Sequence, residues 1–159
     1  MPMPSTGSPA PPFTLPDQDG QAVSLAALNG RWVVLYFYPR DDTPGCTREA
    51  CNFRDNFAAL QSAGVVILGL SPDTGAAHKK FIAKYDLPFA LLVDGPDHAV
   101  ARAYGAWGLK KNYGKEYEGM IRSTVIVAPD GTVAKSWAKV KPDRHGEEVL
   151  AWLKEHSAG

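Results

Sequence analysis

The sequence has 159 residues, 45% of them hydrophobic, and its 17 basic residues balance 17 acidic ones. We expect one domain over residues 1–159, because this length suits one hydrophobic core and is short for two. The basic residues are spread along the chain, so they form no positively charged patch for nucleic acid or an anionic membrane. No stretch approaches the roughly 18 to 20 continuous apolar residues of a membrane span, and Met1–Pro12 lacks the basic start and apolar centre of a signal peptide, so we expect a cytoplasmic protein.

Predicted strands and helices alternate along the chain. Asp17–Gly20 has the composition of a hairpin turn, which predicts a small N-terminal hairpin. Four β-branched and aromatic runs are typical of strands covered on both faces; they are Trp32–Tyr38, Val65–Leu70, Ala90–Val93 and Thr124–Val127. Helical spacing marks four further segments, the last after a cap at Asp143; they are Thr43–Ala63, Gly75–Tyr85, Asp97–Tyr104 and Arg144–His156.

The end of the chain indicates the type of sheet. Pro129–Gly131 separates two strand-like runs and has the composition of a hairpin turn, so the last two strands are expected to be antiparallel and the sheet mixed. A mixed central sheet flanked by helices, with an N-terminal hairpin as an extension, predicts an α/β fold of the thioredoxin-like type. Gly105–Gly119 is expected to be the one long irregular connection, and such a connection can border an active site.

The first cysteine lies where a helix is expected to begin, after a strand end and a polar loop. If Thr43 is the N-cap, Pro44 takes the first helical position, where its missing N–H costs nothing, and Cys46 takes the third. Free backbone N–H groups and the helix dipole then favour thiolate over thiol by about 0.3 to 1 kcal/mol per charge. A cysteine tuned to react near neutral pH usually needs a further cation. We therefore expect an arginine or a histidine beside it.

The spacing of Cys46 and Cys51 argues against a permanent bridge between them. On a regular helix their Cα atoms would be about 8.6 Å apart, whereas a disulfide tolerates at most about 7 Å. The pair can therefore bond only when the helix unwinds locally, which the weak helix formers Gly45, Thr47 and Asn52 make inexpensive. Two other interpretations stay open: two buried cysteines packed as small hydrophobes, and a metal pair, against which stand the missing C-x-x-C spacing and the scattered histidines.

Several segments together form a recognisable pattern, in which C-x-x-x-x-C after a Thr-Pro-Gly turn is joined to a distant Arg-Ser-Thr strand. The segments are Pro11, Pro12, Phe13, Leu15, Asp17 and Gly20; Tyr36–Asp55; Tyr104–Gly119; and Ile121–Thr124 leading to Pro129–Gly131. The chain resembles the peroxiredoxins over nearly its whole length, specifically the bacterioferritin-comigratory or Q-type subfamily, which has both cysteines in one helix. Leu109, Ala128 and Arg144 depart from the family pattern, and none of them is a proposed catalytic group.

The resemblance implies that Cys46 is the peroxidatic cysteine and Cys51 the resolving one, with Pro39, Thr43 and Arg122 completing the active-site motif. Arg122 would supply the expected cation, since a unit charge at about 4 Å and an effective dielectric near 20 is worth roughly 4 kcal/mol before desolvation. The Thr43 hydroxyl would hydrogen-bond the peroxide or the sulfur, and Pro39 would shape the pocket and exclude water. The simpler interpretations are a surface arginine for Arg122 and a helix cap alone for Thr43.

Other side chains near the motif have open roles. Glu49, on the same helical face as the first cysteine, could orient an arginine through a bidentate contact, or it could be an ordinary solvated glutamate. Tyr36, Tyr38, Phe53 and Trp107 could form an apolar rim, although aromatic residues in such runs are more often core residues, and we assign them no catalytic role.

The four histidines fall in helical segments rather than in the cysteine loop, and we expect them at the surface. A preformed thiolate needs no general base, so none is required for the chemistry. They are His78, His98, His145 and His156.

The implied reaction oxidises Cys46 to a sulfenic acid with release of water or an alcohol, closes a disulfide to Cys51, and restores both thiols with an external reductant. The family points to thioredoxin as that reductant and to hydroperoxides as substrates, and it implies no metal, flavin or haem. Resolution within one chain favours a monomer. The rivals are a thiol–disulfide oxidoreductase, which usually carries C-x-x-C, and a non-catalytic thioredoxin-fold interaction module.

Overall fold

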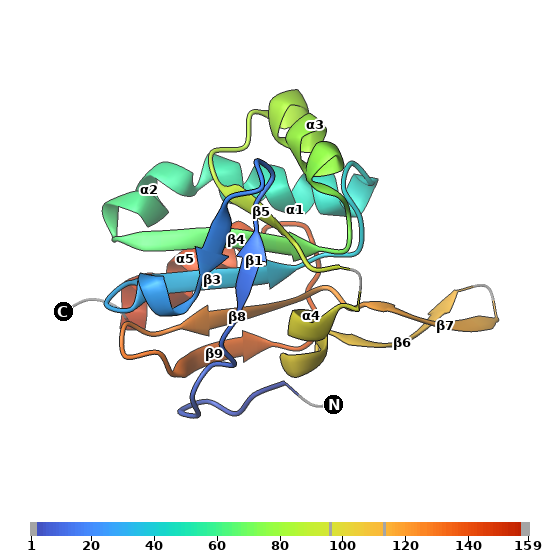
Figure 1. The fold of residues 1–159 in the computed structure, drawn as a ribbon. Coiled ribbons are helices and arrows are strands. Elements are labelled where there is room, and N and C mark those ends of the chain that lie inside the picture. Colours follow the sequence, from blue (N-terminus) through green and yellow to red (C-terminus); the bar gives the residue numbers. More distant parts are fainter. Residues whose placement is uncertain (1–2, 96, 113, 157–159) are drawn as a thin grey trace.

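A five-stranded sheet forms the centre of the molecule (Figure 1). The computed structural model describes residues 3–95, 97–112 and 114–156. The strand order is β5-β4-β3-β8-β9. These strands are β3 (Trp32–Phe37), β4 (Val65–Ser71), β5 (Ala90–Val93), β8 (Ser123–Val127) and β9 (Val133–Trp137). The four predicted strands are confirmed, with ends that differ by at most one residue.

The sheet is mixed, as the hairpin turn predicted. The central strand β3 pairs in parallel with β4 and antiparallel with β8. β4 and β5 are parallel, whereas β8 and β9 are antiparallel and are joined by the expected turn. In that turn, Asp130 Oδ1 accepts hydrogen bonds from the backbone N–H and the hydroxyl of Thr132, at 3.0 and 2.6 Å. The antiparallel pairing places the start of β8 beside the carboxyl end of β3, where the cysteine loop begins.

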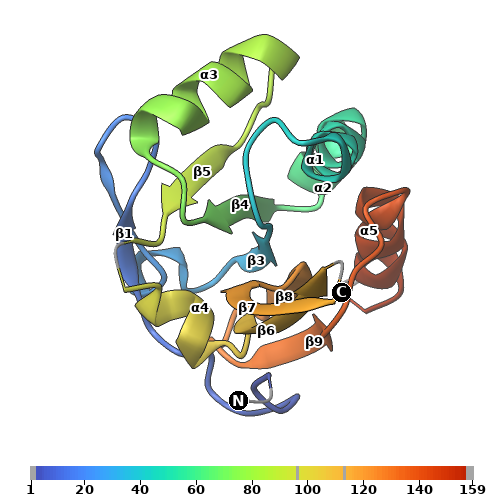
Figure 2. The same cartoon turned by 90° about the vertical axis from the view of Figure 1, so that its right-hand side faces the viewer.

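Helices cover both faces of the sheet (Figure 2). They are α1 (Pro44–Asp55), α2 (Phe57–Ser62), α3 (Gly75–Tyr85), α4 (Ala99–Ala103) and α5 (His145–His156). On one face, α1, α2, α3 and α5 contribute Phe53, Leu60, Phe81 and Leu153 to a shared core cluster. α4 lies on the opposite face with β1, as Figure 2 shows. The expected α/β arrangement is confirmed, and within the described ranges no helix has the length and apolar character needed to cross a bilayer.

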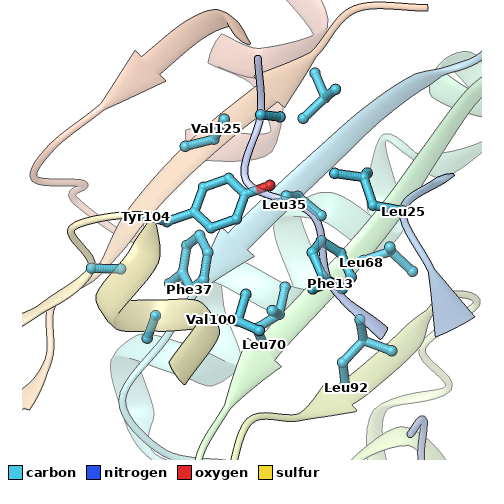
Figure 3. Close-up of a cluster of buried hydrophobic side chains, with 14 of the residues drawn as sticks. Phe13, Leu25, Leu35, Phe37, Leu68, Leu70, Leu92, Val100, Tyr104 and Val125 are labelled. Atoms are coloured by element: carbon cyan, nitrogen blue, oxygen red, sulfur yellow. The ribbon is translucent and has the colours of Figure 1, made fainter. Parts of the chain in front are cut away.

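The N-terminal hairpin is also confirmed and closes the second face. β1 (Thr14–Pro16) and β2 (Ala22–Ser24) are antiparallel, and a short 3-10 helix, η1 (Ala26–Leu28), follows them. Asp17 Oδ1 organises the turn by accepting the backbone N–H groups of Asp19 and Gln21 at 2.8 and 3.0 Å. Phe13 and Leu25 pack into the core beside Tyr104 of the segment after α4 (Figure 3).

The segment Gly105–Gly119 was expected to be irregular, and this prediction is wrong. It forms β6 (Trp107–Asn112) and all but the last residue of β7 (Lys115–Met120), and these strands pair antiparallel in a separate two-stranded sheet. Figure 1 shows this hairpin projecting from the body of the molecule. Its described residues include exposed Leu109 and Lys115–Glu118, and the strands show no alternation of apolar and polar residues by which the sequence could have predicted them. Tyr113, which also falls in this segment, lies outside the described residues.

The predicted helix over Thr43–Ala63 is two helices. Asn56 separates α1 from α2 with φ −103° and ψ 5°, and its side chain donates to the Asn52 carbonyl at 2.8 Å, beside the bond from its own backbone N–H. The predicted helix over Asp97–Tyr104 is shorter and covers Ala99–Ala103. In the first turn, the buried Asp94 carboxylate accepts the N–H groups of Val100 and Ala101, at 3.2 and 2.7 Å.

The last helix begins at His145 and is capped by a different residue from the one predicted. The Asp143 carboxylate accepts a hydrogen bond from Arg48 of α1 at 2.7 Å. The N–H of Glu147 donates instead to Asn52 Oδ1, also on α1, at 3.1 Å. Asn52 therefore links the helix that carries both cysteines to the start of α5.

The close approach of α5 to α1 requires a glycine. A Cβ built on Gly146 would lie 2.9 Å from the backbone carbon and oxygen of Asn52, which cannot move aside as a flexible side chain would. We predict that Gly146→Ala lowers the free energy of unfolding by about 1 to 3 kcal/mol, the usual cost of overpacking, as measured by urea denaturation. The control is Gly95→Ala, whose new Cβ would meet only Pro72 O at 4.0 Å. Equal stability of the two variants would contradict this account of the packing.

Candidate active site

The loop after β3 leads into α1 with the geometry that the sequence predicted. Thr43 is the N-cap in extended conformation, with φ −96° and ψ 155°, and Pro44 opens the helix. Cys46 therefore takes the third helical position, among the N–H groups that have no partner inside the helix. The Thr43 hydroxyl, however, donates to the Arg40 carbonyl at 2.9 Å and makes no side-chain cap. The hydroxyl thus fixes the loop rather than the helix end.

Arg122 is the cation beside the cysteine. Its Nη2 donates to Cys46 Sγ at 3.2 Å, although the two residues are 76 positions apart in the sequence. Cys46 itself is 1% exposed. Arg122 directly precedes β8, and the antiparallel pairing of β3 with β8 brings it over the first turn of α1. A helix start and a guanidinium therefore act on the same sulfur, and both favour the thiolate.

Gly45 makes room for this contact. A Cβ at this position would lie 3.0 Å from Arg122 Nη2, closer than most side chains come to one another. The glycine in the Thr-Pro-Gly turn thus lets the guanidinium lie directly against the first turn of the helix. Its function is steric, because its backbone does not adopt a positive φ.

Glu49 is buried and binds Arg122 through one oxygen. Arg122 Nη1 donates to Glu49 Oε1 at 2.7 Å, while Oε2 is buried without a hydrogen-bond partner among the described residues. The interpretation that Glu49 orients an arginine is therefore the better one, although the contact uses one oxygen and is not bidentate; the interpretation as a solvated glutamate is wrong. Burial raises the pKa of the Glu49 carboxyl to about 7, against the lowering effect of the Arg122 charge.

Arg122 keeps its positive charge in this buried setting. Burial acts to lower the pKa of Arg122, but the negative charges of Glu49 and Cys46 and their hydrogen bonds act more strongly together, and the net shift is upward. The guanidinium thus uses two separate N–H groups for two partners, a carboxyl and a sulfur. This division holds its orientation relative to the thiol, as the fork geometry of arginine allows and a lysine does not.

A cavity of about 570 Å³ opens beside the guanidinium. Pro39 and Arg122 line it together with residues from the hairpin and from the segment after β9; the lining residues are Pro39, Leu109, Lys110, Ile121, Arg122, Lys139 and Val140. Lys110 also donates from Nζ to the Met120 carbonyl at 2.9 Å, and burial together with the charge of Arg122 lowers its pKa. The β6–β7 hairpin, expected only as an irregular border of the site, contributes a wall of it.

Both cysteines lie in the same unbroken helix. α1 runs from Pro44 to Asp55, and Cys46 and Cys51 are free thiols in it, the first buried and the second half-buried. The intact helix therefore keeps the two sulfurs unbonded.

The aromatic residues belong to the core. Tyr36 stacks between Tyr38 and Phe53, with ring centroids 5.4 and 4.7 Å away, and all three side chains are buried. Trp107 stacks instead on His98 at 4.0 Å, next to α4. None of the four is among the residues that line the cavity at Arg122, so the core interpretation made from the sequence is the better one.

The expectation that all four histidines lie at the surface is wrong for two of them, and His98 is half-buried. His78 and His145 are fully buried. His145 Nε2 lies 2.8 Å from Thr124 Oγ1, and burial lowers the pKa of its imidazole. Each buried histidine shares a helix face with a core residue one turn later, Phe81 for His78 and Val149 for His145. That spacing was a sequence signal for burial, and it was missed.

A thiol held against a guanidinium at the start of a helix is the arrangement of an enzyme that uses cysteine as a nucleophile. Comparison with known proteins specifies the class. The AhpC/TSA family matches residues 6–136 of the chain. A putative peroxiredoxin Bcp of Coxiella burnetii is 49% identical over 92% of this chain and 97% of its own length. Peroxiredoxin Bcp of Bacillus subtilis is 47% identical over 95% of this chain and 96% of its own.

Solved structures agree with the sequence comparison. Peroxiredoxin Q of Xanthomonas campestris superposes with a TM-score of 0.86 and 41% identity, covering 92% of each chain. A cysteine-to-serine mutant of Xylella fastidiosa PrxQ gives a TM-score of 0.89 at 31% identity, covering 99% of this chain and 98% of its own. The thioredoxin-like fold is thereby confirmed. The chain belongs to the peroxiredoxin family and, within it, to the Bcp or Q-type subfamily. It is accordingly a thiol-dependent peroxidase.

The raised pKa of Glu49 makes part of the stability depend on pH. Between the ordinary value of 4.5 and about 7, the unfolded chain ionises this carboxyl while the folded protein keeps it protonated, so the free energy of unfolding falls as the pH rises through this window. One pKa unit is worth about 1.4 kcal/mol, which sets the loss at roughly 3 kcal/mol or less.

We predict that Glu49→Gln removes the part of the pH dependence that comes from this carboxyl. The free energy of unfolding of the variant, relative to that of the unmodified protein, should therefore increase from about pH 5 to about pH 8. Urea denaturation at both pH values measures the difference. Glu155→Gln, at an exposed position of α5, is the control and should show no such trend. A Glu49→Gln curve that runs parallel to that of the unmodified protein would contradict the prediction.

Proposed function

We propose that Cys46 is the peroxidatic cysteine and Cys51 the resolving cysteine, with Arg122, Thr43 and Pro39 completing the site. The observation that carries this proposal is the contact of 3.2 Å between Arg122 Nη2 and Cys46 Sγ in the first turn of α1. The rest of the proposal follows from what a buried, arginine-bound thiolate can attack.

In the first step, the Cys46 thiolate attacks the terminal oxygen of a hydroperoxide. A sulfur–oxygen bond forms, the O–O bond breaks, and the leaving oxygen takes a proton from solvent and departs as water or an alcohol. Cys46 is oxidised to the sulfenic acid and the peroxide is reduced. Arg122 stabilises the negative charge that develops on the oxygens, and it does so without reorganisation because Glu49 already holds its position.

Thr43 helps to position the peroxide, and Pro39 keeps water away from it. The Thr43 hydroxyl lies one turn before the sulfur and, when it turns from the Arg40 carbonyl, can donate to an oxygen of the substrate. Pro39 forms part of the wall of the cavity beside Arg122 and excludes water from it.

In the second step, α1 unwinds so that Cys51 can reach Cys46. The Cys51 thiol attacks the sulfenic sulfur, a disulfide forms, and the oxygen leaves as water. Support for unwinding comes from the intact helix, in which a five-residue separation keeps two Cα atoms about 8.6 Å apart, beyond the reach of a disulfide. The step also places the buried sulfur of Cys46 within reach of an outside reductant.

In the third step, a dithiol protein of the thioredoxin type reduces the disulfide. Two electrons pass from its thiols to the Cys46–Cys51 bond, which returns both cysteines to the reduced state. The whole cycle uses sulfur chemistry alone and calls on no metal, flavin or haem.

The cavity suits peroxides larger than hydrogen peroxide. Leu109, Ile121 and Val140 line it with apolar side chains, which favour an organic group on the substrate. The related bacterioferritin comigratory protein of Xanthomonas campestris, which is 40% identical, has been described with alkyl peroxide reduction activity. We propose that this chain reduces organic hydroperoxides as well as hydrogen peroxide.

We further propose that residues 1–159 form one domain that works as a cytoplasmic monomer and binds neither nucleic acid nor membrane. The first two steps use groups of a single chain, the third needs only an outside reductant, and the charges of the chain balance. A second subunit is therefore not needed for catalysis.

Serine variants test the two cysteine roles. We predict that Cys46→Ser abolishes peroxide turnover, whereas Cys51→Ser reacts once and accumulates a sulfenic acid, because only the resolving thiol is missing. Stopped-flow kinetics with hydrogen peroxide and mass spectrometry after dimedone trapping measure both outcomes. Rapid multiple turnover by Cys46→Ser would exclude it as the peroxidatic residue.

Arg122→Met tests the electrostatic role. Loss of a preorganised donor at the developing charge should lower the second-order rate constant for peroxide by about 100- to 1000-fold, and the pH–rate profile should move to higher pH because the thiolate loses its cation. Arg48→Met is the matched control on α1, since Arg48 is exposed and pairs with Asp143. Equal rates and profiles in the two variants would remove Arg122 from the site.

A further inference from the structure

The loop that leads into the cysteine helix is anchored by a buried carboxylate. Asp41, 9% exposed, lies between Pro39 and Thr43 of the proposed site. Its Oδ1 accepts the Tyr38 hydroxyl at 2.6 Å, and its backbone N–H donates to Asp73 Oδ2 at 2.8 Å. The carboxylate thus faces the protein interior, where an unpaired charge is costly.

The partner of this carboxylate is the fully buried His78 of α3. His78 Nδ1 lies 2.6 Å from Asp41 Oδ2, and His78 Nε2 lies 2.9 Å from the Leu92 carbonyl of β5. A carbonyl oxygen only accepts, so Nε2 must carry a proton. The contact with Asp41 needs a second proton, on Nδ1 or on the carboxyl. In either form the pair is neutral as a whole, and in either form it links the loop to α3 and to β5.

A second contact joins the same loop to the same helix. Lys84 Nζ and the Tyr85 hydroxyl of α3 donate to the Asp42 carboxylate at 2.9 and 3.0 Å. Asp42 has a φ of 57°, in the left-handed region that is uncommon for residues other than glycine. This contact is solvent-exposed and weak by itself. The strained residue next to Asp41 nevertheless indicates that the loop needs support from α3.

We propose that His78 is a positioning residue for peroxide reduction, acting through Asp41. The protonated pair holds the loop from Tyr38 to Thr43 against α3, and so holds Pro39 and Thr43 in place around Cys46. Neither His78 nor Asp41 belongs to α1, so their contact is kept while α1 unwinds. The loop therefore stays in position, and the site can form again when α1 refolds after reduction. The proposal rests on the proposed function.

The size of the expected effect follows from the geometry that catalysis requires. A displacement of about 1 Å, produced far from the reacting atoms, can slow an enzyme by roughly 100-fold. Removal of the imidazole leaves the Asp41 carboxylate buried with a single side-chain donor, Tyr38, and the loop must move to hydrate it.

His78→Leu is the first test, on the full-length protein. The rate constant is measured at a temperature well below the melting temperature of the variant. We expect the second-order rate constant for Cys46 oxidation by hydrogen peroxide to fall by about 10- to 100-fold. Phe81→Leu is the matched control, because Phe81 is buried one turn later on the same face of α3 and has no polar link to the loop. It should lower the melting temperature and leave the rate constant unchanged.

Asp41 variants separate positioning from packing. In Asp41→Asn, the amide can donate to His78 Nδ1 while its oxygen still accepts the Tyr38 hydroxyl, so we expect a rate constant within about threefold of the unmodified protein. Asp41→Ala loses both links and should be slow. Asp41→Asn should also restore part of the rate lost in His78→Leu, because it removes the unpaired charge.

Three results would overturn the proposal: His78→Leu with an unchanged rate constant, Asp41→Ala as fast as Asp41→Asn, or no gain in the double variant. If His78→Leu does not fold, the comparison of Asp41→Asn with Asp41→Ala decides alone. Dimedone trapping of the sulfenic acid in Cys51→Ser tests the proposed function separately. A result in which His78 has no effect on the rate constant can therefore be distinguished from a failure of the peroxidase mechanism.

Discussion

The contact between Arg122 and Cys46 is the interaction on which the rest of the site depends. It joins the start of β8 to the start of α1 across 76 residues of sequence, and the pairing of β3 with β8 makes it possible. Two neighbouring residues support this contact: Gly45 leaves space for the guanidinium, and Glu49 accepts a hydrogen bond from its Nη1. The sheet therefore acts as the frame that brings a distant cation to a helix terminus.

The charges in this site are close to self-compensating. The Arg122 guanidinium lies between the Cys46 sulfur and the Glu49 carboxyl, and a glutamate with a pKa of about 7 can take up or release a proton without breaking its contact. Buried charges are costly unless they are paired, and the arrangement gives the guanidinium two partners in the protein interior. The buried pair of Asp41 and His78 follows the same rule at the other end of the loop.

The sequence was informative wherever local chemistry determines structure. The apolar runs of the central strands, the Thr43–Pro44 helix start and the Pro129–Gly131 turn each depend on neighbouring residues, and the structure confirms them. Arg122 was found through a resemblance, since no local pattern joins residues so far apart. Helical spacing carried a signal for the burial of His78, but its partners Asp41 and the Leu92 carbonyl come from distant elements that no local pattern joins. The capping of α5 by Asn52 depends on the same kind of contact.

The capping of α5 by Asn52 couples the two helices. Asn52 adjoins Cys51, and its side-chain oxygen accepts the Glu147 N–H, a type of bond worth about 1 kcal/mol to a helix. Arg48, on the same turn as Cys46, holds Asp143 just ahead of α5. Uncoiling of α1 as far as these two residues would therefore remove two supports of the C-terminal helix. The oxidised and reduced chains would then present different surfaces to a reductant that must tell them apart.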